Sequence, residues 1–344
     1  MRALVCVPGG TEVADVPDPR PGDAEVVVEV EACGVCGSDV HLVESGHAAV
    51  GQVLGHEFSG RVVATGRAAN RWRIGQPVSV NPVGGCGDCP PCRAGLPFRC
   101  PRVPNIGIDA PGAYAEYVAV PQTQLVALPE DVDPEVGAYA EPLAVALRAV
   151  DLASPAPTDT ALVYGVGAIG LNVIAALRVV GVDHIVAVGR SPGRRRAATA
   201  VGADDVLDSG QTDLVTWARE HSLSFQAGFD CSGAPGALAD TLSVLCPGGV
   251  SVQVALRGDP EPVDVGALVG RGLSLVGSCA FRRSDFEAAV EHLLAGRVSG
   301  ASLVSERLPL EQAPDALVRL RRSGDLVRVL VQPCRQESRR EVIA

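Results

Sequence analysis

Residues 161–190 read ALVYGVGAIGLNVIAALRVVGVDHIVAVGR, and they carry the clearest indication of the fold. The segment begins with a short apolar run, passes through a glycine-rich hexad at 165–170, and continues with the periodicity of an apolar helix. It ends in a second apolar run at 184–190. A strand, a glycine turn, a helix and another strand in this order form a βαβ unit. The segment therefore predicts a βαβ unit of a parallel sheet.

The glycine hexad has the spacing of a dinucleotide-binding loop. Glycines at these positions allow a tight turn and let the backbone approach a pyrophosphate, which then faces the positive end of the next helix. The hexad lies between a buried strand and an apolar helix, which is the context that such a loop requires. We therefore predict that the dinucleotide contacts Gly165, Gly167, Ala168, Ile169 and Gly170.

The acidic residue that would bind the ribose hydroxyls at the end of the next strand is missing. Gly189 occupies that position, Arg190 follows it, and Arg194 lies at the start of the next predicted helix. Loss of the carboxylate removes the repulsion of a 2′-phosphate, and an arginine nearby can bind one. A solvated basic helix start is the alternative, but it is unfavourable at the positive end of the helix dipole. We predict a preference for NADP(H), with NAD(H) possible.

Composition narrows the classes of function. The chain has 344 residues, a hydrophobic fraction of 47% and a charged fraction of 20%, which is typical of a globular protein with two domains. A formal net charge of −11 disfavours binding to nucleic acid or to an anionic membrane. All 29 basic residues are arginine, which excludes lysine Schiff-base chemistry. No signal-peptide pattern and no bilayer-spanning apolar run is found, so we expect a cytoplasmic protein.

A cluster of four cysteines is the strongest metal-binding signal. Cys86, Cys89, Cys92 and Cys100 lie within a short segment rich in Gly, Asp and Pro, which can wrap around one ion. A closed, tetrahedral all-thiolate shell is typical of structural Zn²⁺. Disulfides are disfavoured without an export signal, and nothing else in the chain suggests the electron transfer of an iron–sulfur protein. Such a site has no open coordination position, so it stabilises a loop and does no chemistry.

A second candidate metal site lies upstream, in CGVCGSDVH at 33–41 and GHE at 55–57. Buried thiols and a core histidine would explain this spacing equally well. The order of motifs along the chain is more informative. ACGVCGSDVH, LGHEFSG, the four-cysteine segment, EPLAVAL and the glycine hexad occur in one order, which resembles the zinc-containing medium-chain dehydrogenases. The chain is most similar to the 2,3-butanediol, sorbitol and threonine dehydrogenase branch, and the resemblance covers nearly its whole length.

The resemblance implies two domains. Alternating runs such as AEVVVEVEA and FSGRVVATG already predict a mostly β region in the first part of the chain. The family's fold makes this region a GroES-like catalytic domain, which we expect to comprise residues 1–152 and 291–344. Residues 153–290 are expected to form the α/β Rossmann domain, a doubly wound parallel sheet that binds the dinucleotide.

The resemblance also assigns the second metal site. Cys36 and His56 become ligands of a catalytic zinc, whereas Cys33 is not a ligand in the family. Both Glu57 and Glu141 are candidates for the third protein ligand, and the choice stays open. Asp39 resembles the carboxylate that orients the histidine ligand and sets its tautomer.

The implied reaction is hydride transfer between a small secondary alcohol or vicinal diol and a nicotinamide dinucleotide. An open position on Zn²⁺ lowers the pKa of an alcohol hydroxyl, and the proton is expected to leave through Ser38 and then His41. We accordingly predict two Zn²⁺ ions per chain. By resemblance the protein is also expected to be a homo-oligomer, either a tetramer or a dimer.

Three alternatives remain at this point. The first is a polyol or amino-alcohol dehydrogenase that uses NAD(H). The second is a catalytically silent protein in which only the four-cysteine zinc site is needed, and the joint presence of Cys36, Ser38, His41 and His56 argues against it. The third is a zinc-independent quinone or enoyl reductase on the same fold, a group that lacks the metal ligands.

Overall fold

The computed structural model describes residues 1–256, 259–322 and 326–334 of the chain. The chain divides into two compact units, one formed by Met1–Glu141 with Phe281–Ala344, the other by Pro142–Ala280. Among the described residues, no helix combines the length and the apolar character needed to cross a membrane.

The crossings between the units differ from those expected from the sequence, which were after residues 152 and 290. In the structure the chain leaves the first unit after Glu141 and returns at Phe281. The return is earlier because helix α10 (Arg283–Leu294) packs against helix α3 (Pro134–Ala138) of the first unit. In addition, the Arg283 guanidinium donates a hydrogen bond to the Thr123 carbonyl. Helix α10 therefore belongs to the first unit, although its amphipathic sequence resembles the sequences of the helices in the second unit.

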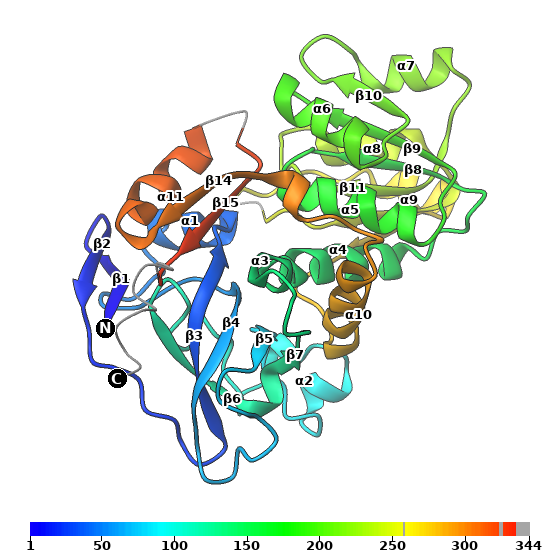
Figure 1. The fold of residues 1–344 in the computed structure, drawn as a ribbon. Coiled ribbons are helices and arrows are strands. Elements are labelled where there is room, and N and C mark those ends of the chain that lie inside the picture. Colours follow the sequence, from blue (N-terminus) through cyan, green and yellow to red (C-terminus); the bar gives the residue numbers. More distant parts are fainter. Residues whose placement is uncertain (257–258, 323–325, 335–344) are drawn as a thin grey trace. The chain divides into compact units, whose positions relative to one another are not determined.

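The first unit is built on a mixed sheet with strand β3 at its centre (Figure 1). The strands run in the order β14-β15-β3-β4-β5-β7. Strand β6 pairs with the first half of β3, from Glu25 to Glu29, whereas β15 pairs with the end of β3. These strands are β3 (Glu25–Gly34), β4 (Glu57–Thr65), β5 (Pro77–Val80), β6 (Tyr117–Pro121), β7 (Leu125–Ala127), β14 (Val304–Pro309) and β15 (Arg328–Gln332). A separate antiparallel hairpin consists of β1 (Arg2–Val7) and β2 (Gly10–Asp15).

Short helices connect and cover this sheet. They are α1 (Gly37–Glu44), α2 (Pro90–Arg93), α3, α10 and α11 (Ala313–Arg322), with 3₁₀ turns η1 (Pro97–Arg99), η2 (Gln122–Gln124), η3 (Ala301–Leu303) and η4 (Leu310–Gln312). The core lies on one face of the sheet, where the alternate residues Val26, Val28 and Val30 of β3 are fully buried. Strands β3 and β4 are antiparallel, with Gly34 opposite Glu57. The end of β3 and the start of β4 therefore meet at one end of the sheet.

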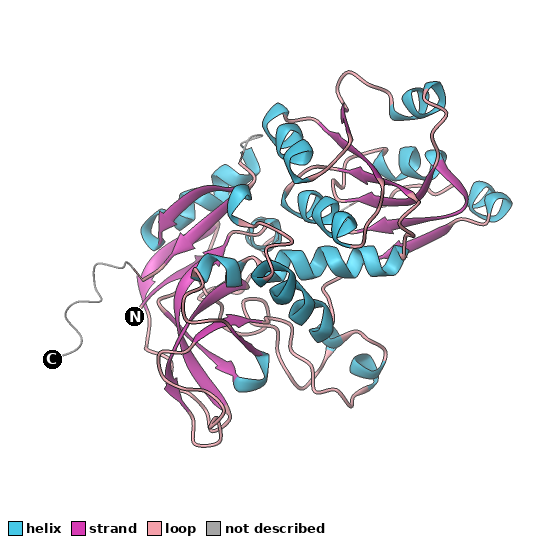
Figure 2. Ribbon diagram, turned by 45° about the vertical axis from the view of Figure 1, so that its right-hand side comes forward, coloured by secondary structure: helices cyan, strands magenta, loops and turns pink. Residues whose placement is uncertain are grey.

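The second unit is a six-stranded parallel sheet in the order β10-β9-β8-β11-β12-β13. Its strands are β8 (Thr160–Tyr164), β9 (His184–Gly189), β10 (Asp205–Asp208), β11 (Phe225–Asp230), β12 (Leu245–Gln253) and β13 (Ser274–Gly277). Its helices are α5 (Ala168–Val179), α6 (Pro192–Val201), α7 (Leu214–Glu220), α8 (Ala237–Val244) and α9 (Val265–Arg271), and α4 (Ala140–Ala153) leads into it from the first unit. Figure 2 shows helices flanking these strands.

The strand order confirms the doubly wound parallel sheet. From β8 the chain moves outward through β9 to β10, then returns to the other side of β8 and continues through β11, β12 and β13. Strands β8 and β11 thus form the point where the direction of winding reverses, and ligands of such sheets bind beside the carboxyl ends of the strands at this point. The glycine hexad directly follows β8, so the fold puts it at that position.

Candidate zinc and dinucleotide sites

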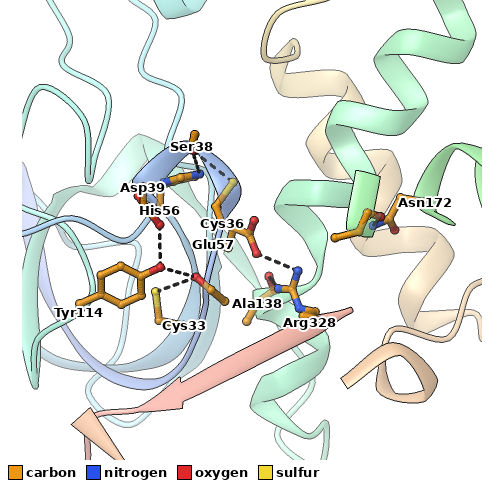
Figure 3. A network of polar contacts seen from close by, with 12 residues as sticks. Cys33, Cys36, Ser38, Asp39, His56, Glu57, Tyr114, Ala138, Asn172 and Arg328 are labelled. Carbon is orange, nitrogen blue, oxygen red and sulfur yellow. Dashed lines mark hydrogen bonds and ion pairs between the residues drawn. The ribbon is translucent and has the colours of Figure 1, made fainter. Parts of the chain in front are cut away.

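The first candidate site lies where β3 ends and β4 begins. Cys36 is the N-cap of α1, two residues after β3, while His56 and Glu57 stand at the start of β4. One potential ligand atom from each of these three residues lies within 4.8 Å of the others (Figure 3). A thiolate, an imidazole and a carboxylate are the donors that zinc takes in proteins. The residues present therefore fit a zinc ion.

The Asp39 carboxylate faces the imidazole of His56. The Asp39 side chain is fully buried, and its Oδ1 lies 3.2 Å from His56 Nδ1. A carboxylate at this position favours the tautomer with a proton on Nδ1, which leaves the lone pair of Nε2 available for a metal ion. The geometry is that expected from the sequence for Asp39.

The carboxylates around Cys36 and His56 favour a positive charge at this site. Burial raises the pKa of the Cys36 thiol, and the Glu57 carboxylate raises it further. Burial lowers the pKa of His56, but the Asp39 carboxylate and Cys36 raise it, and the net pKa lies well above its ordinary value. A divalent cation would replace the protons on both side chains, because metal ligands bind in their deprotonated forms.

Ser38 contacts two of the three candidate ligands. Its hydroxyl donates a hydrogen bond of 3.2 Å to Cys36 Sγ, and its Oγ lies 3.4 Å from His56 Nε2. His41 is exposed on α1, and no hydrogen bond joins it directly to Ser38, although both residues lie in the described part of the chain. The structure thus brings Ser38 to the metal site and leaves His41 apart from it.

Glu57 is held by a residue that the sequence analysis did not identify. Arg328 Nη1 lies 2.7 Å from Glu57 Oε2, and the two side chains are 3% and 4% exposed. Arg328 Nη2 also donates a hydrogen bond of 2.8 Å to the Ala138 carbonyl, and its guanidinium lies over the Tyr139 ring. The sequence held one indication of this role, because Arg328 is the single charged residue of the apolar strand RVLVQ. A charge in a buried strand needs a partner of opposite charge.

Glu141 lies near the same group without joining it. It is buried in the first turn of α4, and burial raises its pKa to about 8, with His56 opposing and Glu57 adding to the increase. In the described residues, the carboxylate grouped with Cys36 and His56 is that of Glu57 and not that of Glu141. The geometry therefore favours Glu57 over Glu141 as the third ligand, a choice that the sequence left open.

The four cysteines of the second site converge as a closed group. Cys86 Sγ lies 3.9 Å from Cys92 Sγ, and Cys89 Sγ lies 3.9 Å from Cys100 Sγ. All four sulfur atoms lie within 4.8 Å of one another. Zinc–sulfur bonds of about 2.3 Å in a tetrahedron put sulfur atoms about 3.8 Å apart, whereas a disulfide needs about 2.05 Å. The group fits a structural zinc ion.

The glycine loop of the second unit has the shape of a phosphate cradle. Gly165 has a φ of +99°, and a Cβ added to Gly170 would lie 1.8 Å from the Gly165 carbonyl oxygen. Gly167 is the N-cap of α5, and among the described residues the only atom within 4 Å of a Cβ added there is Nη1 of Arg194, at 3.9 Å. The loop thus leaves open space in front of a helix N-terminus, where backbone N–H groups can bind a pyrophosphate.

The structure adds a packing reason for Gly189, the last residue of β9. A Cβ at Gly189 would lie 2.1 Å from Val166 Cγ2, so a larger residue requires Val166 to move. Arg190 is exposed beside it. Arg195 is paired within the unit, since its Nη1 lies 2.8 Å from Asp208 Oδ2 and bonds the Arg190 carbonyl at 2.6 Å. Arg195 is therefore engaged within the second unit.

Comparisons with known proteins agree with both units. The family model of the alcohol dehydrogenase GroES-like domain matches residues 22–130, and that of the zinc-binding dehydrogenases matches residues 168–295. The L-threonine 3-dehydrogenase of Bacillus velezensis is 31% identical over 335 residues, which cover 94% of this chain and 96% of that protein.

Solved structures give the same result. An alcohol dehydrogenase from Escherichia coli CFT073, complexed with NADH, superimposes with a TM-score of 0.91 at 28% identity, covering 96% of this chain and 99% of that one. A zinc-binding dehydrogenase from Sinorhizobium meliloti 1021, bound to NADP, gives a TM-score of 0.90 at 30% identity with the same coverage. With the two metal-ligand groups and the glycine loop in place, this chain belongs to the zinc-dependent, NAD(P)-linked alcohol dehydrogenase family.

Proposed function

We propose that this protein oxidises a small secondary alcohol or vicinal diol, or reduces the matching ketone, with NADP(H) as hydride carrier. The observation that carries the proposal is the group of half-buried Cys36 and buried His56 and Glu57, whose ligand atoms lie within 4.8 Å of one another. A thiol, an imidazole and a carboxylate held this close together make a site for a catalytic cation, and family membership makes that cation zinc.

Cys36, His56 and Glu57 would hold the zinc ion, with Asp39 orienting His56. When bound, zinc acts as a Lewis acid that lowers the pKa of an alcohol hydroxyl, and the dinucleotide accepts the hydride. Ser38 Oγ, within 3.4 Å of Cys36 Sγ and His56 Nε2, is suited to accept the hydroxyl proton. We propose that the exposed His41 passes the proton to solvent. Since it makes no direct hydrogen bond to Ser38, a water molecule or a cofactor hydroxyl must bridge them.

Glu141 has a separate role in the proposal. Its raised pKa, about 8, lets it exchange a proton near neutral pH beside the metal ligands. Glu141 is buried and the Glu57 carboxylate raises its pKa, so a bound cation would relieve the repulsion between the two negative charges. Glu141 would thus supply a second carboxylate able to hold the zinc ion in place of Glu57.

The preference for NADP(H) rests on residues of this chain. One solved relative is complexed with NADH and another is bound to NADP, so relatives accept either cofactor. Here Gly189 removes the repelling carboxylate, while Arg190 and Arg194 supply positive charge beside the glycine loop. Measuring kcat/KM for both cofactors tests this step, and values that are equal or favour NAD(H) contradict it.

Metal content separates the enzyme from a catalytically silent relative. The purified protein should contain two zinc ions per chain, and Cys36→Ser should retain one ion and lose turnover. Cys89→Ala is the matched variant at the four-cysteine site. A wild-type protein that saturates at one zinc ion, held by the four cysteines, would support the silent alternative.

The substrate is best found by a paired screen. Small diols, polyols, hydroxyketones and amino alcohols such as threonine should be tested with each dinucleotide by following absorbance of the reduced nicotinamide. An amino alcohol is the second candidate, because a relative at 31% identity is named L-threonine 3-dehydrogenase. A cytoplasmic homo-oligomer, tetrameric or dimeric, remains a prediction, and light scattering of the purified protein tests its oligomeric part.

A further inference from the structure

Tyr114 lies behind the candidate catalytic zinc site and is fully buried. Its backbone is held on both sides, since its carbonyl accepts a hydrogen bond from Leu4 N and its N–H donates one to the Leu54 carbonyl. Its hydroxyl oxygen lies 2.6 Å from Asp39 Oδ2 and 3.0 Å from the Gly34 carbonyl oxygen (Figure 3). The hydroxyl is therefore directed at the carboxylate that contacts His56.

The hydroxyl has one proton and two acceptors within reach. A carboxylate accepts a shorter and stronger hydrogen bond than a neutral carbonyl, and Asp39 Oδ2 is the nearer of the two. The proton of Tyr114 therefore goes mainly to Asp39. The two oxygens of the carboxylate are then divided, with Oδ2 facing Tyr114 and Oδ1 facing His56 Nδ1 at 3.2 Å.

This division fixes the plane of the carboxylate. Rotation of the Asp39 carboxylate would break the short bond to Tyr114, and Asp39 is 0% exposed, so water cannot replace that bond. Without the hydroxyl, Oδ2 would be a buried carboxylate oxygen with no hydrogen-bond donor among the described residues. The carboxylate would then turn, and its contact with His56 Nδ1 would weaken.

We propose that Tyr114 is a positioning residue for the zinc ligand His56, acting through Asp39. The inference rests on the proposed catalytic zinc site and deepens it. Hydrogen-bonding partners of metal-bound histidines set the ring orientation and tautomer, and their loss weakens metal binding. A phenylalanine would fill the same space in the core, so any effect of its substitution on zinc comes from the hydroxyl.

The test uses the full-length holoenzyme and the variant Tyr114→Phe. Zinc affinity is measured by competition with a chromogenic chelator, and Cys36→Ser identifies the ion that belongs to this site. Tyr114→Phe should bind that ion about tenfold more weakly, the lower end of the effect for such partners. The four-cysteine ion should be unaffected. The control is Tyr117→Phe, which removes a hydroxyl from a half-buried tyrosine of β6 in the same unit.

A double-substitution cycle tests the route through Asp39. If Tyr114 acts through that carboxylate, Tyr114→Phe should have no further effect on zinc affinity in an Asp39→Asn background. Cobalt(II) substitution supplies a spectroscopic readout, because the visible bands of the His56 site should shift in Tyr114→Phe but not in Tyr117→Phe. Wild-type zinc affinity and unchanged cobalt spectra in Tyr114→Phe, or additive effects in the cycle, would overturn the proposal.

A measurement on the wild-type protein covers the case in which Tyr114→Phe does not fold. Nitrogen-15 NMR of histidine-labelled, zinc-loaded enzyme should show His56 with its proton on Nδ1, and a proton on Nε2 would contradict the inference. The failure of the proposed function looks different, since the wild-type protein itself would then lack the zinc ion at Cys36 and His56. Two zinc ions and normal turnover, with no effect of Tyr114→Phe, would refute only the inference.

Discussion

Replacing Arg328 by leucine removes the partner of a buried carboxylate. Arg328 and Glu57 are 2.7 Å apart, and both side chains are nearly inaccessible to water. The pair fills the space over Gly34, where an added Cβ would lie 2.2 Å from Glu57 Oε2 and 2.5 Å from Arg328 Nη2. The substitution would also remove the donor to the Ala138 carbonyl and the cation above the Tyr139 ring.

The size of the effect follows from burial. Removing one member of a buried ion pair costs about 3–5 kcal/mol, because the remaining charge stays out of water without compensation. An ion pair on the surface contributes only about 0–1 kcal/mol. Arg319 and Glu306 make such a pair, with Nη2 and Oε2 also 2.7 Å apart but side chains 45% and 30% exposed. Arg319→Leu is therefore a control with the same chemistry and a different environment.

Urea unfolding followed by tryptophan fluorescence is the assay. The chain has two tryptophans, Trp72 in the first unit and Trp217 in the second. A Trp217→Phe background makes the signal report on the first unit alone. Arg328→Leu should lower the free energy of unfolding by about 3–5 kcal/mol and Arg319→Leu by at most about 1 kcal/mol. Equal losses in the two variants would refute the assignment of Arg328 as the compensating charge of Glu57.

Four further predictions concern the sites themselves. Arg194→Leu should lower kcat/KM with NADP about 10- to 100-fold and leave kcat/KM with NAD unchanged, since a charged hydrogen bond contributes about 1.5–3 kcal/mol. Equal losses of kcat/KM with the two cofactors would contradict phosphate binding by Arg194. Ser38→Ala should lower kcat at least about 100-fold with both zinc ions retained, and normal kcat would exclude it from proton transfer. Zinc binding at the Cys36 site should weaken as pH falls, because His56, whose pKa is raised well above its ordinary value, takes up a proton in competition with the metal. A zinc affinity that stays unchanged as the pH is lowered would argue against His56 as a ligand. Cys89→Ala should lose one zinc ion and lower the melting temperature, whereas an unchanged melting temperature would deny the four-cysteine ion a structural role.

Local sequence patterns were sufficient for the parts of this protein whose residues are close together in the chain. The four cysteines are drawn together by the turns between them, and the glycine hexad acts through its own backbone and the helix that it begins. Both patterns therefore predicted structure correctly, and together with the order of motifs they predicted the family. The missing carboxylate at Gly189 is local as well, and the NADP(H) preference drawn from it remains a prediction.

Contacts between segments that are distant in the sequence could be identified only in the folded sheet. Glu57 and not Glu141 joins Cys36 and His56, because β3 and β4 pair with Gly34 opposite Glu57. Arg328 reaches Glu57 because β15 pairs with the end of β3, where Leu330 lies opposite Gly34. The Tyr114 hydroxyl likewise meets Asp39 across 75 residues of sequence. Such contacts depend on strand register and on which segments share a core, and the spacing of residues along one segment carries no information about either.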